Sequence, residues 1–172
     1  MIYYEFMSKA VFAGSFDPPT YGHLDIIGRA SAMFDSVDVA VAVNPDKRCL
    51  FSVEERLAMM SDLTAPFANV SAHRCDGLVV EYARSRGAAV LLRGVRGAGD
   101  FSYELDLAML NRRLCRDVET LFIPSEQEHL VLRSSAVKEL ARFGGDISGM
   151  VPPAVAEALR VKFGLTKPIN VI

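Results

Sequence analysis

The feature that most constrains the fold of this chain is an alternation of two patterns that begins at Lys9. Short apolar runs rich in Val, Ile and Phe alternate about five times with longer stretches of helical spacing. This alternation is typical of βαβ units, in which helices cover both faces of a parallel sheet. We therefore predict an α/β fold with a doubly wound, five-stranded parallel sheet in a single domain. The expected strands are Ala10–Ala13, Val37–Val43, Asn69–Ala72, Ala89–Arg93 and Glu119–Ile123.

Six stretches are expected to form helices, and capping or breaking residues mark several of their ends. Thr20 can cap the first helix, Ser52 and Glu55 form a capping box before the second, and the third stops at Gly87. The fourth carries two apolar seams, so one can face the sheet while the other is left for a partner. The expected helices are Gly22–Phe34, a stretch that starts after Ser52, Leu78–Arg86, Phe101–Arg116, Ser135–Phe143 and Pro153–Phe163.

The composition fits one globular domain. The chain has 172 residues, of which 51% are hydrophobic and 23% are charged, and this argues against intrinsic disorder. Its 19 basic and 21 acidic side chains give a net charge of −2, without the basic excess of a duplex-DNA binder. No apolar run approaches the roughly 20 residues of a membrane span. We therefore expect neither a nucleic-acid partner nor a membrane partner.

The domain is expected to span residues 8–163, with a flexible N-terminal extension at 1–7 and a C-terminal tail at 164–172. Met7 offers an alternative start, and the first six residues lack the basic start and apolar stretch of a signal peptide. The cysteines are odd in number and widely spaced, which favours free thiols over a disulfide framework or a zinc site. A cytoplasmic protein is the resulting prediction. The three cysteines are Cys49, Cys75 and Cys115.

The loop after the first strand is the first candidate site, because ligands of a doubly wound sheet bind beyond the carboxyl ends of its strands. This loop, Gly14–His23, leads directly into a helix. Ser15, Thr20 and His23 then lie beside a helix N-terminus that favours an anion, and His23 can donate a hydrogen bond to a phosphate. Taken singly, Thr20 is equally an ordinary cap and His23 an exposed residue of the first turn. All ten residues together favour a phosphate site.

Two more loops bring cations to the same edge of the sheet. Lys47, within Asn44–Arg48, can neutralise a phosphate, although adjacent Lys and Arg are also typical of a solvated turn. Arg93 directly follows a buried apolar run, where an unpaired charge is costly. A phosphate can satisfy this guanidinium. A carboxylate can do the same, and the candidates are Asp100, Glu104 and Asp106.

The loop before the fifth expected helix, together with the absence of several catalytic motifs, limits the reactions that this chain can catalyse. Ser134 and Ser135 precede a helix, where they can contact a second anion or act as a plain N-cap. The chain contains no GxSxG elbow and no GxxxxGK[ST] phosphate loop, and its histidines form no HxxxH metal pair. A phosphate site without a covalent nucleophile suits phosphoryl or nucleotidyl transfer, in which positioning and charge stabilisation supply most of the catalysis.

Several segments, taken in order, resemble one enzyme family. Gly14-Ser15-Phe16-Asp17-Pro18-x-Thr20-x-Gly22-His23 resembles the TxGH-type signature of nucleotidylyltransferases related to class I aminoacyl-tRNA synthetases. With the later segments, the chain resembles the bacterial phosphopantetheine adenylyltransferases over residues 8–163. The ordered set is more specific than its first element, which relatives share. The later segments are Asn44-Pro45-x-Lys47, Arg93-Gly94-Val95-Arg96, Asp100-Phe101-x-Tyr103-Glu104 and Ser134-Ser135-x-Val137-Lys138-Glu139.

The resemblance implies a Rossmann-like subunit, assembled as a homohexamer, that transfers AMP from ATP to 4′-phosphopantetheine. The products are dephospho-coenzyme A and pyrophosphate; Mg²⁺ is expected through the ATP phosphates with no protein ligand, and coenzyme A is an implied feedback ligand. His23 would stabilise the transition state, with Lys47 and Arg93 also catalytic. The implied substrate-binding residues are Ser15, Lys47, Val79 and Arg93. Those implied for ATP are Ser15, Phe16, His23, Gly94, Val95, Arg96, Glu104, His129, Leu130, Val131, Leu132, Arg133, Ser134 and Ser135.

Some positions depart from the family pattern, and other functions compete. Ala13 replaces an expected proline, and Leu132-Arg133 stands where Ile-Ser is commoner, so Arg133 can contact phosphate or point to solvent. The nearest rivals are relatives that act on nicotinamide or nicotinic acid mononucleotide, or cytidylyltransferases; these typically have histidine in place of Thr20. A regulatory module without turnover predicts loss of His23 or of the cations, and none is missing.

Overall fold

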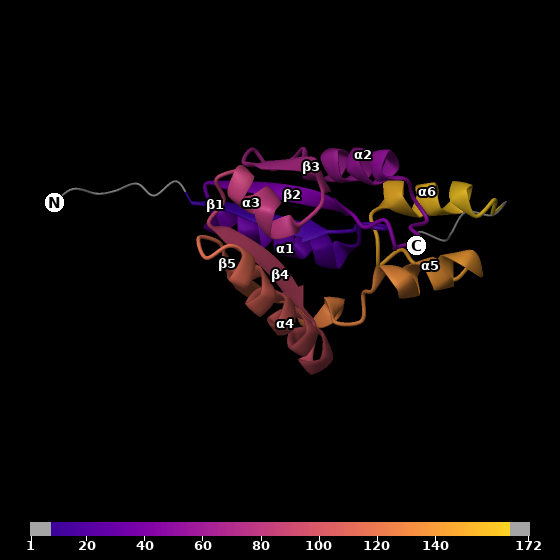
Figure 1. The fold of residues 1–172 in the computed structure, drawn as a ribbon. Helices are drawn as coiled ribbons and strands as arrows, with labels where there is room; N and C mark the ends of the chain where they lie inside the picture. The colour runs from indigo at the N-terminus through magenta and orange to yellow at the C-terminus, as the bar shows by residue number, and fades with distance from the viewer. Residues whose placement is uncertain (1–7, 166–172) are drawn as a thin grey trace.

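The fold is built on a sheet of five parallel strands, as the alternation predicts. The computed structural model describes residues 8–165, so the expected extension at 1–7 and the tail from residue 166 lie outside the described residues. The strands lie side by side in the order β3-β2-β1-β4-β5 (Figure 1). The predicted doubly wound α/β fold is confirmed. The strands are β1 (Lys9–Gly14), β2 (Ser36–Val43), β3 (Val70–Asp76), β4 (Val90–Val95) and β5 (Glu119–Pro124).

Helices cover both faces of this sheet because successive strand residues point to opposite sides. Phe12 of β1 packs in one core cluster with residues of α1 (Tyr21–Met33) and α2 (Val53–Thr64). Its neighbour Val11 packs in a second cluster with residues of α3 (Val79–Ser85). Because the central strands are buried on both faces, their sequences are mostly apolar runs without regular polar alternation.

The helix starts agree closely with the capping signals. Thr20 is the N-cap of α1. At α2, the Ser52 hydroxyl accepts a hydrogen bond from the Glu55 N–H at 3.1 Å, and the Glu55 carboxylate accepts one from the Ser52 N–H at 2.7 Å. The predicted capping box is therefore present. Gly87 follows α3 with a φ of 69°, a left-handed conformation that glycine adopts without strain.

β3 is longer than its sequence suggests. It continues past the expected end at Ala72 to Asp76, and its whole length pairs with β2 in parallel register. The added residues, His73-Arg74-Cys75-Asp76, are mostly polar because β3 lies at the edge of the sheet. A polar edge strand is common in proteins, since it discourages pairing with another chain.

The helix α4 (Ala98–Leu114) begins at Ala98 instead of Phe101, and it contains no buried side chain. Phe101 packs edge-on against Phe122 of β5, with ring centroids 5.2 Å apart. The seam that contains Phe101 thus faces the sheet, but large apolar side chains on both seams stay exposed in the single chain. Phe101, Tyr103, Leu105, Met109, Leu110 and Leu114 are between 40% and 64% exposed.

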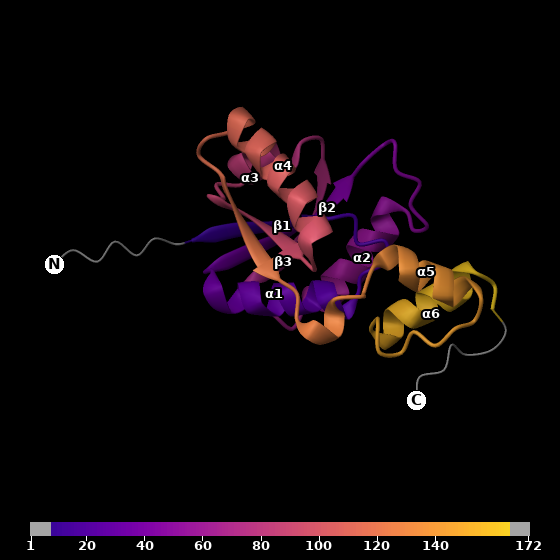
Figure 2. The ribbon, with the colours of Figure 1, turned by 90° about the horizontal axis from the view of Figure 1, so that it is seen from below.

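The last two helices, α5 (Ser134–Arg142) and α6 (Pro153–Lys162), follow a short 3₁₀ turn at Gln127–His129. Figures 1 and 2 show both helices beyond the end of the sheet opposite the start of β1. They share a third core cluster with Phe51, which precedes α2. Among residues 8–165, no helix is long and apolar enough to cross a bilayer.

Candidate active site

The candidate site is a cleft at the carboxyl ends of β1 and β4. The chain winds from β1 to β3 in one direction and from β4 to β5 in the other, so these adjacent strands mark the topological switch point of the sheet. The cleft has a volume of about 410 Å³. Five cationic and two anionic side chains line it, which makes it locally positive although the chain as a whole carries −2. Its cations are Lys47, Arg93, Arg96, Arg133 and Lys138.

His23 lies in the first turn of α1 with a defined tautomer. Its Nδ1 accepts a hydrogen bond from the Thr20 backbone N–H at 3.0 Å, so the ring proton of the neutral imidazole is on Nε2. Burial, and to a lesser extent the charge of Arg96, lowers the pKa of His23 to about 4. At neutral pH the imidazole is therefore uncharged. It lies beside a helix N-terminus, where it can donate a hydrogen bond to an anion.

The Phe16 ring packs against the His23 ring. The backbone of Phe16 is in the left-handed region, with a φ of 47°, which is unusual for a residue other than glycine. Its ring is buried and packs edge-on against His23, with centroids 5.0 Å apart. The strained turn thus places an aromatic ring behind the imidazole and restricts its movement. Any contact of Phe16 with a ligand would come from its backbone.

Gly94 allows the strand β4 to approach α1 closely. A Cβ at this position would lie 2.2 Å from Cδ1 of Ile26, a residue of α1 that lines the same cleft. Any larger residue would therefore force the end of the Ile26 side chain to move. The family resemblance implies a role for Gly94 in binding ATP, and the structure adds this close approach to Ile26.

Two cations, Lys47 from the segment between β2 and α2 and Arg93 from β4, line the cleft. The Lys47 ammonium donates a hydrogen bond to the Ser15 hydroxyl at 2.8 Å. The Arg93 guanidinium binds the Glu104 carboxylate with two hydrogen bonds, at 2.6 and 2.8 Å, and donates a third to the Ala13 carbonyl at 3.1 Å. Of the three carboxylates considered as partners for Arg93, Glu104 is the one the structure selects. Two of the five guanidinium N–H groups of Arg93 remain for a ligand.

Arg96 is held in a similar way at the start of α4. Its Nε donates to Asp100 at 2.7 Å, and its Nη1 donates to the Leu132 carbonyl at 3.2 Å. The second contact joins the loop after β4 to the segment that leads into α5. Arg133 of that segment is 62% exposed, and its guanidinium lies 3.8 Å from Asp100. It lines the cleft but is mostly in solvent.

The start of α5 closes the cleft. The N-cap of this helix is Arg133, so the alternative that Ser134 or Ser135 is a plain N-cap is wrong. The Ser134 hydroxyl instead donates to the Pro18 carbonyl at 2.8 Å, which ties α5 to the loop after β1. One turn later, Lys138 binds the buried Asp17 carboxylate at 2.6 Å.

Asp17 and Lys138 are site residues that the sequence reasoning missed, although it quoted both within motifs. Asp17 stands before a proline, a position that is typical of a turn residue. The signal for Lys138 was its spacing, because residues i and i+4 share a helix face and Ser134 is four positions earlier. The signal for Asp17 was weaker, since its partners lie 33, 34 and 121 positions away in the chain.

His129 contributes a polar atom that has no partner in the described chain. Its side chain is 15% exposed and lines the cleft beside Leu132. The Nδ1 atom is buried and makes no hydrogen bond with other described residues. Buried polar atoms are normally satisfied, so an unpaired atom at a cleft is available to a ligand.

Most of the predicted site residues line this one cleft, while five do not. Phe16 lies beneath it, Val95 ends β4, and Val79 begins α3 and packs in the second core cluster. Leu130 and Val131 are 40% and 75% exposed. The predicted residues that line the cleft are Ser15, His23, Lys47, Arg93, Gly94, Arg96, Glu104, His129, Leu132, Arg133, Ser134 and Ser135.

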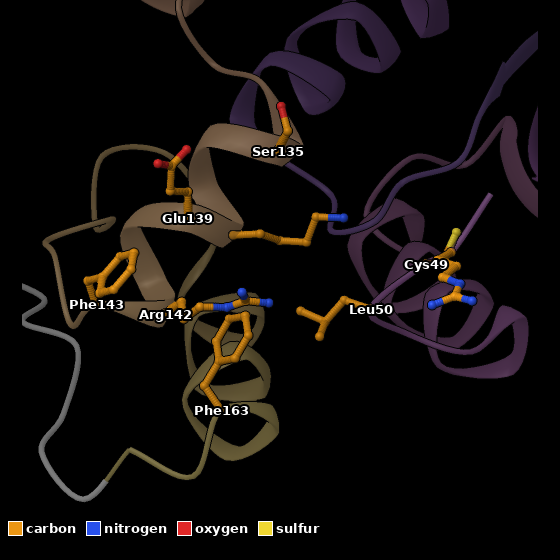
Figure 3. Close-up of a pocket in the computed structure, with 9 residues that line it drawn as sticks. Cys49, Leu50, Ser135, Glu139, Arg142, Phe143 and Phe163 are labelled. Atoms are coloured by element: carbon orange, nitrogen blue, oxygen red, sulfur yellow. The ribbon is translucent and has the colours of Figure 1, made fainter.

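A second pocket of about 510 Å³ adjoins the cleft on the far side of Lys138 and Ser135, which line both. Figure 3 shows the Arg142 and Phe163 side chains on the α5 and α6 side, and Leu50 on the side of the segment between β2 and α2. The Arg142 guanidinium lies 5.5 Å from the centre of the Phe163 ring. The pocket therefore widens the cleft toward the C-terminal helices.

Comparisons with known proteins give a consistent result. Residues 11–140 match the family described as Cytidylyltransferase-like. A phosphopantetheine adenylyltransferase from Symbiobacterium thermophilum is 50% identical over 94% of this chain and 100% of its own length, and one from Alkaliphilus metalliredigens is 44% identical over 91% and 99%. A crystal structure from Vibrio parahaemolyticus, of a candidate nicotinate-nucleotide adenylyltransferase, has a TM-score of 0.64 and 20% identity, over 94% of this chain and 98% of that one. This last likeness concerns the fold alone.

Proposed function

We propose that this chain transfers the adenylyl group of ATP to 4′-phosphopantetheine. The premise is that the chain belongs to the cytidylyltransferase-like family and, within it, to the phosphopantetheine adenylyltransferases. The products are dephospho-coenzyme A and pyrophosphate. The observation that carries this function is the neutral His23 donor in a cleft lined by five cations, which suits a reaction between two phosphate groups.

The chemistry is a direct in-line transfer. A phosphate oxygen of 4′-phosphopantetheine forms a bond to the α-phosphorus of ATP, and the bond to the bridging oxygen breaks as pyrophosphate leaves with the electron pair. A phosphomonoester is largely a dianion near neutral pH, so the attack needs no general base. His23 donates from Nε2 to a phosphate oxygen of ATP whose charge grows in the transition state. Because Thr20 already fixes the ring, this donor needs no reorganisation as the charge develops.

The proposed phosphopantetheine site is the side of the cleft that holds Ser15, Lys47 and Arg93. Lys47 uses one of its three ammonium protons for Ser15, which leaves two for the substrate phosphate. Arg93 is fixed by Glu104 and keeps two N–H groups for the same anion. Val79 at the start of α3 is proposed to contact the pantetheine arm, which requires that arm to extend out of the cleft toward α3.

The proposed ATP site is the side of the cleft between α5 and the loop after β4, which carries Arg96. Arg96 faces the nucleotide phosphates, with three guanidinium N–H groups beyond those used by Asp100 and Leu132. The unpaired Nδ1 of His129 offers a hydrogen bond to the nucleotide. The remaining contacts are proposed for Ser15, the Phe16 backbone, Gly94, Val95, Glu104, Leu130, Val131, Leu132, Arg133, Ser134 and Ser135.

Mg²⁺ is proposed to enter as part of the nucleotide substrate. Among the described residues, no three His, Cys, Asp or Glu side chains form a group that could hold a metal ion. The two carboxylates of the cleft are also engaged, Asp17 by Lys138 and Glu104 by Arg93. These residues do not fit a resident cation, whereas triphosphate oxygens are good Mg²⁺ ligands.

Self-association and regulation are further parts of the proposal. The exposed apolar side chains of α4 support assembly of several copies, proposed to be six, through this helix. Coenzyme A contains both the pantetheine arm and the adenylyl group of the product, so it is proposed as a feedback ligand of the same cleft. A cytoplasmic location is proposed from the three free cysteines, which suit a reducing compartment.

The test is pyrophosphate release by the purified protein with ATP and Mg²⁺. Separate reactions contain 4′-phosphopantetheine, nicotinamide mononucleotide or nicotinic acid mononucleotide. Release with 4′-phosphopantetheine alone is the expected result. Release with a mononucleotide instead would retain the mechanism and overturn the substrate, and no release in any reaction, with ATP still bound, would favour a regulatory module.

A further inference from the structure

Asp17 is a buried carboxylate that joins three separate segments of the site. We propose that Asp17 is a positioning residue for the phosphopantetheine phosphate, because it anchors the segment that carries Lys47. This inference rests on the proposed function, and it adds a role for a residue that would not itself touch either substrate phosphate.

The contacts of Asp17 explain the anchoring. Its side chain is buried, and its two carboxylate oxygens accept three hydrogen bonds. The Phe51 N–H donates to one oxygen at 2.9 Å, and the Leu50 N–H donates to the other at 3.0 Å. The Lys138 ammonium donates to that second oxygen at 2.6 Å. One side chain of the β1–α1 loop thus holds both the segment that precedes α2 and the helix α5.

The segment that Asp17 anchors has little else to hold it. Residues 44–48 are all exposed, and their internal hydrogen bonds form only a local turn around Asn44. The segment is fixed at one end by β2 and at the other by Leu50 and Phe51. Between these ends, the described side-chain contact of Lys47 is the single hydrogen bond to Ser15. If the second end is released, the ammonium has no fixed position.

The same loop provides the anchor and the partner of Lys47. Ser15 and Asp17 are two positions apart, and both belong to the loop that places His23. The position of the Lys47 ammonium relative to the His23 ring therefore depends on two contacts of this loop, the hydrogen bond from Lys47 to Ser15 and the anchoring of the Lys47 segment by Asp17. Leu50 strengthens this anchoring, because its side chain packs against the core cluster of α5 and α6 while its N–H binds Asp17.

The carboxylate must be ionised to make all three contacts. Burial alone raises the pKa of Asp17, but the hydrogen bonds from Lys138, Phe51 and Leu50 outweigh it and lower the pKa below its usual value. An asparagine has the same shape, yet it offers one acceptor oxygen and an NH₂ group that would face an N–H donor. Asp17→Asn therefore breaks at least one anchor with little change in volume.

The expected effect of Asp17→Asn is a rise in KM for 4′-phosphopantetheine of about tenfold, as for a weakened hydrogen bond between charged groups. If the role of Asp17 were purely structural, Asp17→Asn would lower thermal stability and the active fraction but would leave KM unchanged. Asp46→Asn is the matched control, since it makes the same substitution in the exposed segment that carries Lys47, where the Asp46 side chain has no partner among the described residues. It is expected to leave KM unchanged.

A double-mutant cycle with Lys47→Ala tests whether Asp17 acts through Lys47. In the Lys47→Ala background, Asp17→Asn is expected to raise KM by less than about twofold, because the group it positions is gone. If circular dichroism shows that Asp17→Asn does not fold, Asp17→Ser replaces it in the cycle. The smaller hydroxyl leaves room for water beside the Leu50 and Phe51 amides.

The outcomes separate this inference from the function on which it rests. A non-additive cycle with a raised KM supports the role of Asp17. An active wild-type protein for which Asp17→Asn changes only stability, or raises KM equally with and without Lys47, overturns the inference alone. A wild-type protein that releases no pyrophosphate with 4′-phosphopantetheine overturns the proposed function and the inference together.

Discussion

Replacing His23 with alanine tests the central electrostatic element of the site. The neutral imidazole donates from Nε2, and alanine leaves the growing charge on the nucleotide without this hydrogen bond. Removing one preorganised donor of this kind typically lowers kcat by about 10²–10³-fold. We expect His23→Ala to show a loss in this range, with KM values for both substrates changed far less.

The same change has a small and calculable effect on stability. At neutral pH, His23→Ala removes the hydrogen bond between Nδ1 and the Thr20 N–H, which contributes about 1 kcal/mol to the free energy of unfolding. Because the pKa of His23 falls from 6.5 to about 4 on folding, the unfolded state binds more protons between these values. Wild-type stability therefore falls as the pH drops from 6.5 to about 4, by at most about 3–4 kcal/mol from this residue. His23→Ala lacks this dependence.

The assay is steady-state pyrophosphate release, combined with urea unfolding at pH 7.5 and at pH 5. His73→Ala is the control, because His73 lies on β3, bonds to the Ser71 hydroxyl at 2.9 Å and does not line the cleft. It is expected to retain kcat within about twofold, as a histidine that contacts no substrate should. A folded His23→Ala protein with kcat close to that of the wild type would refute the role assigned to His23.

Three further predictions concern other parts of the molecule. Ser52→Ala removes the hydroxyl that caps α2 and should lower the free energy of unfolding by about 1 kcal/mol in urea titrations; an unchanged midpoint would contradict the capping role. Leu110→Asp places a charge on the exposed face of α4 and should reduce the molar mass measured by light scattering, whereas an unchanged mass would exclude this face from the assembly. EDTA should abolish pyrophosphate release and added Mg²⁺ should restore it; turnover that persists in EDTA would exclude a metal–nucleotide substrate.

The sequence was informative wherever local signals and buried strands agree. The capping box at Ser52 and Glu55, the strands buried on both faces and the stop at Gly87 were all predicted close to their observed positions. Each of these depends on neighbouring residues or on a simple hydropathy period. The position of the cleft also followed, because it depends only on which strand ends carry unusual loops.

The sequence was misleading where structure depends on distant residues. The last part of β3 is polar, so its strand character comes from pairing with β2 and not from its own composition. The start of α4 at Ala98 was hidden by the flanking glycines, Gly97 and Gly99, which have low helix propensity. The contact between Asp17 and Lys138 joins residues 121 positions apart, and local patterns carry no information about such a pair.

The most direct test of the proposed function is the identity of the product. The wild-type protein is incubated with ATP, Mg²⁺ and 4′-phosphopantetheine, and the nucleotide products are analysed by mass spectrometry beside a reaction with His23→Ala. We predict that the wild type forms dephospho-coenzyme A and pyrophosphate in equal amounts, and that the variant forms both far more slowly. Pyrophosphate together with free AMP, or unchanged ATP in the wild-type reaction, would contradict adenylyl transfer to phosphopantetheine.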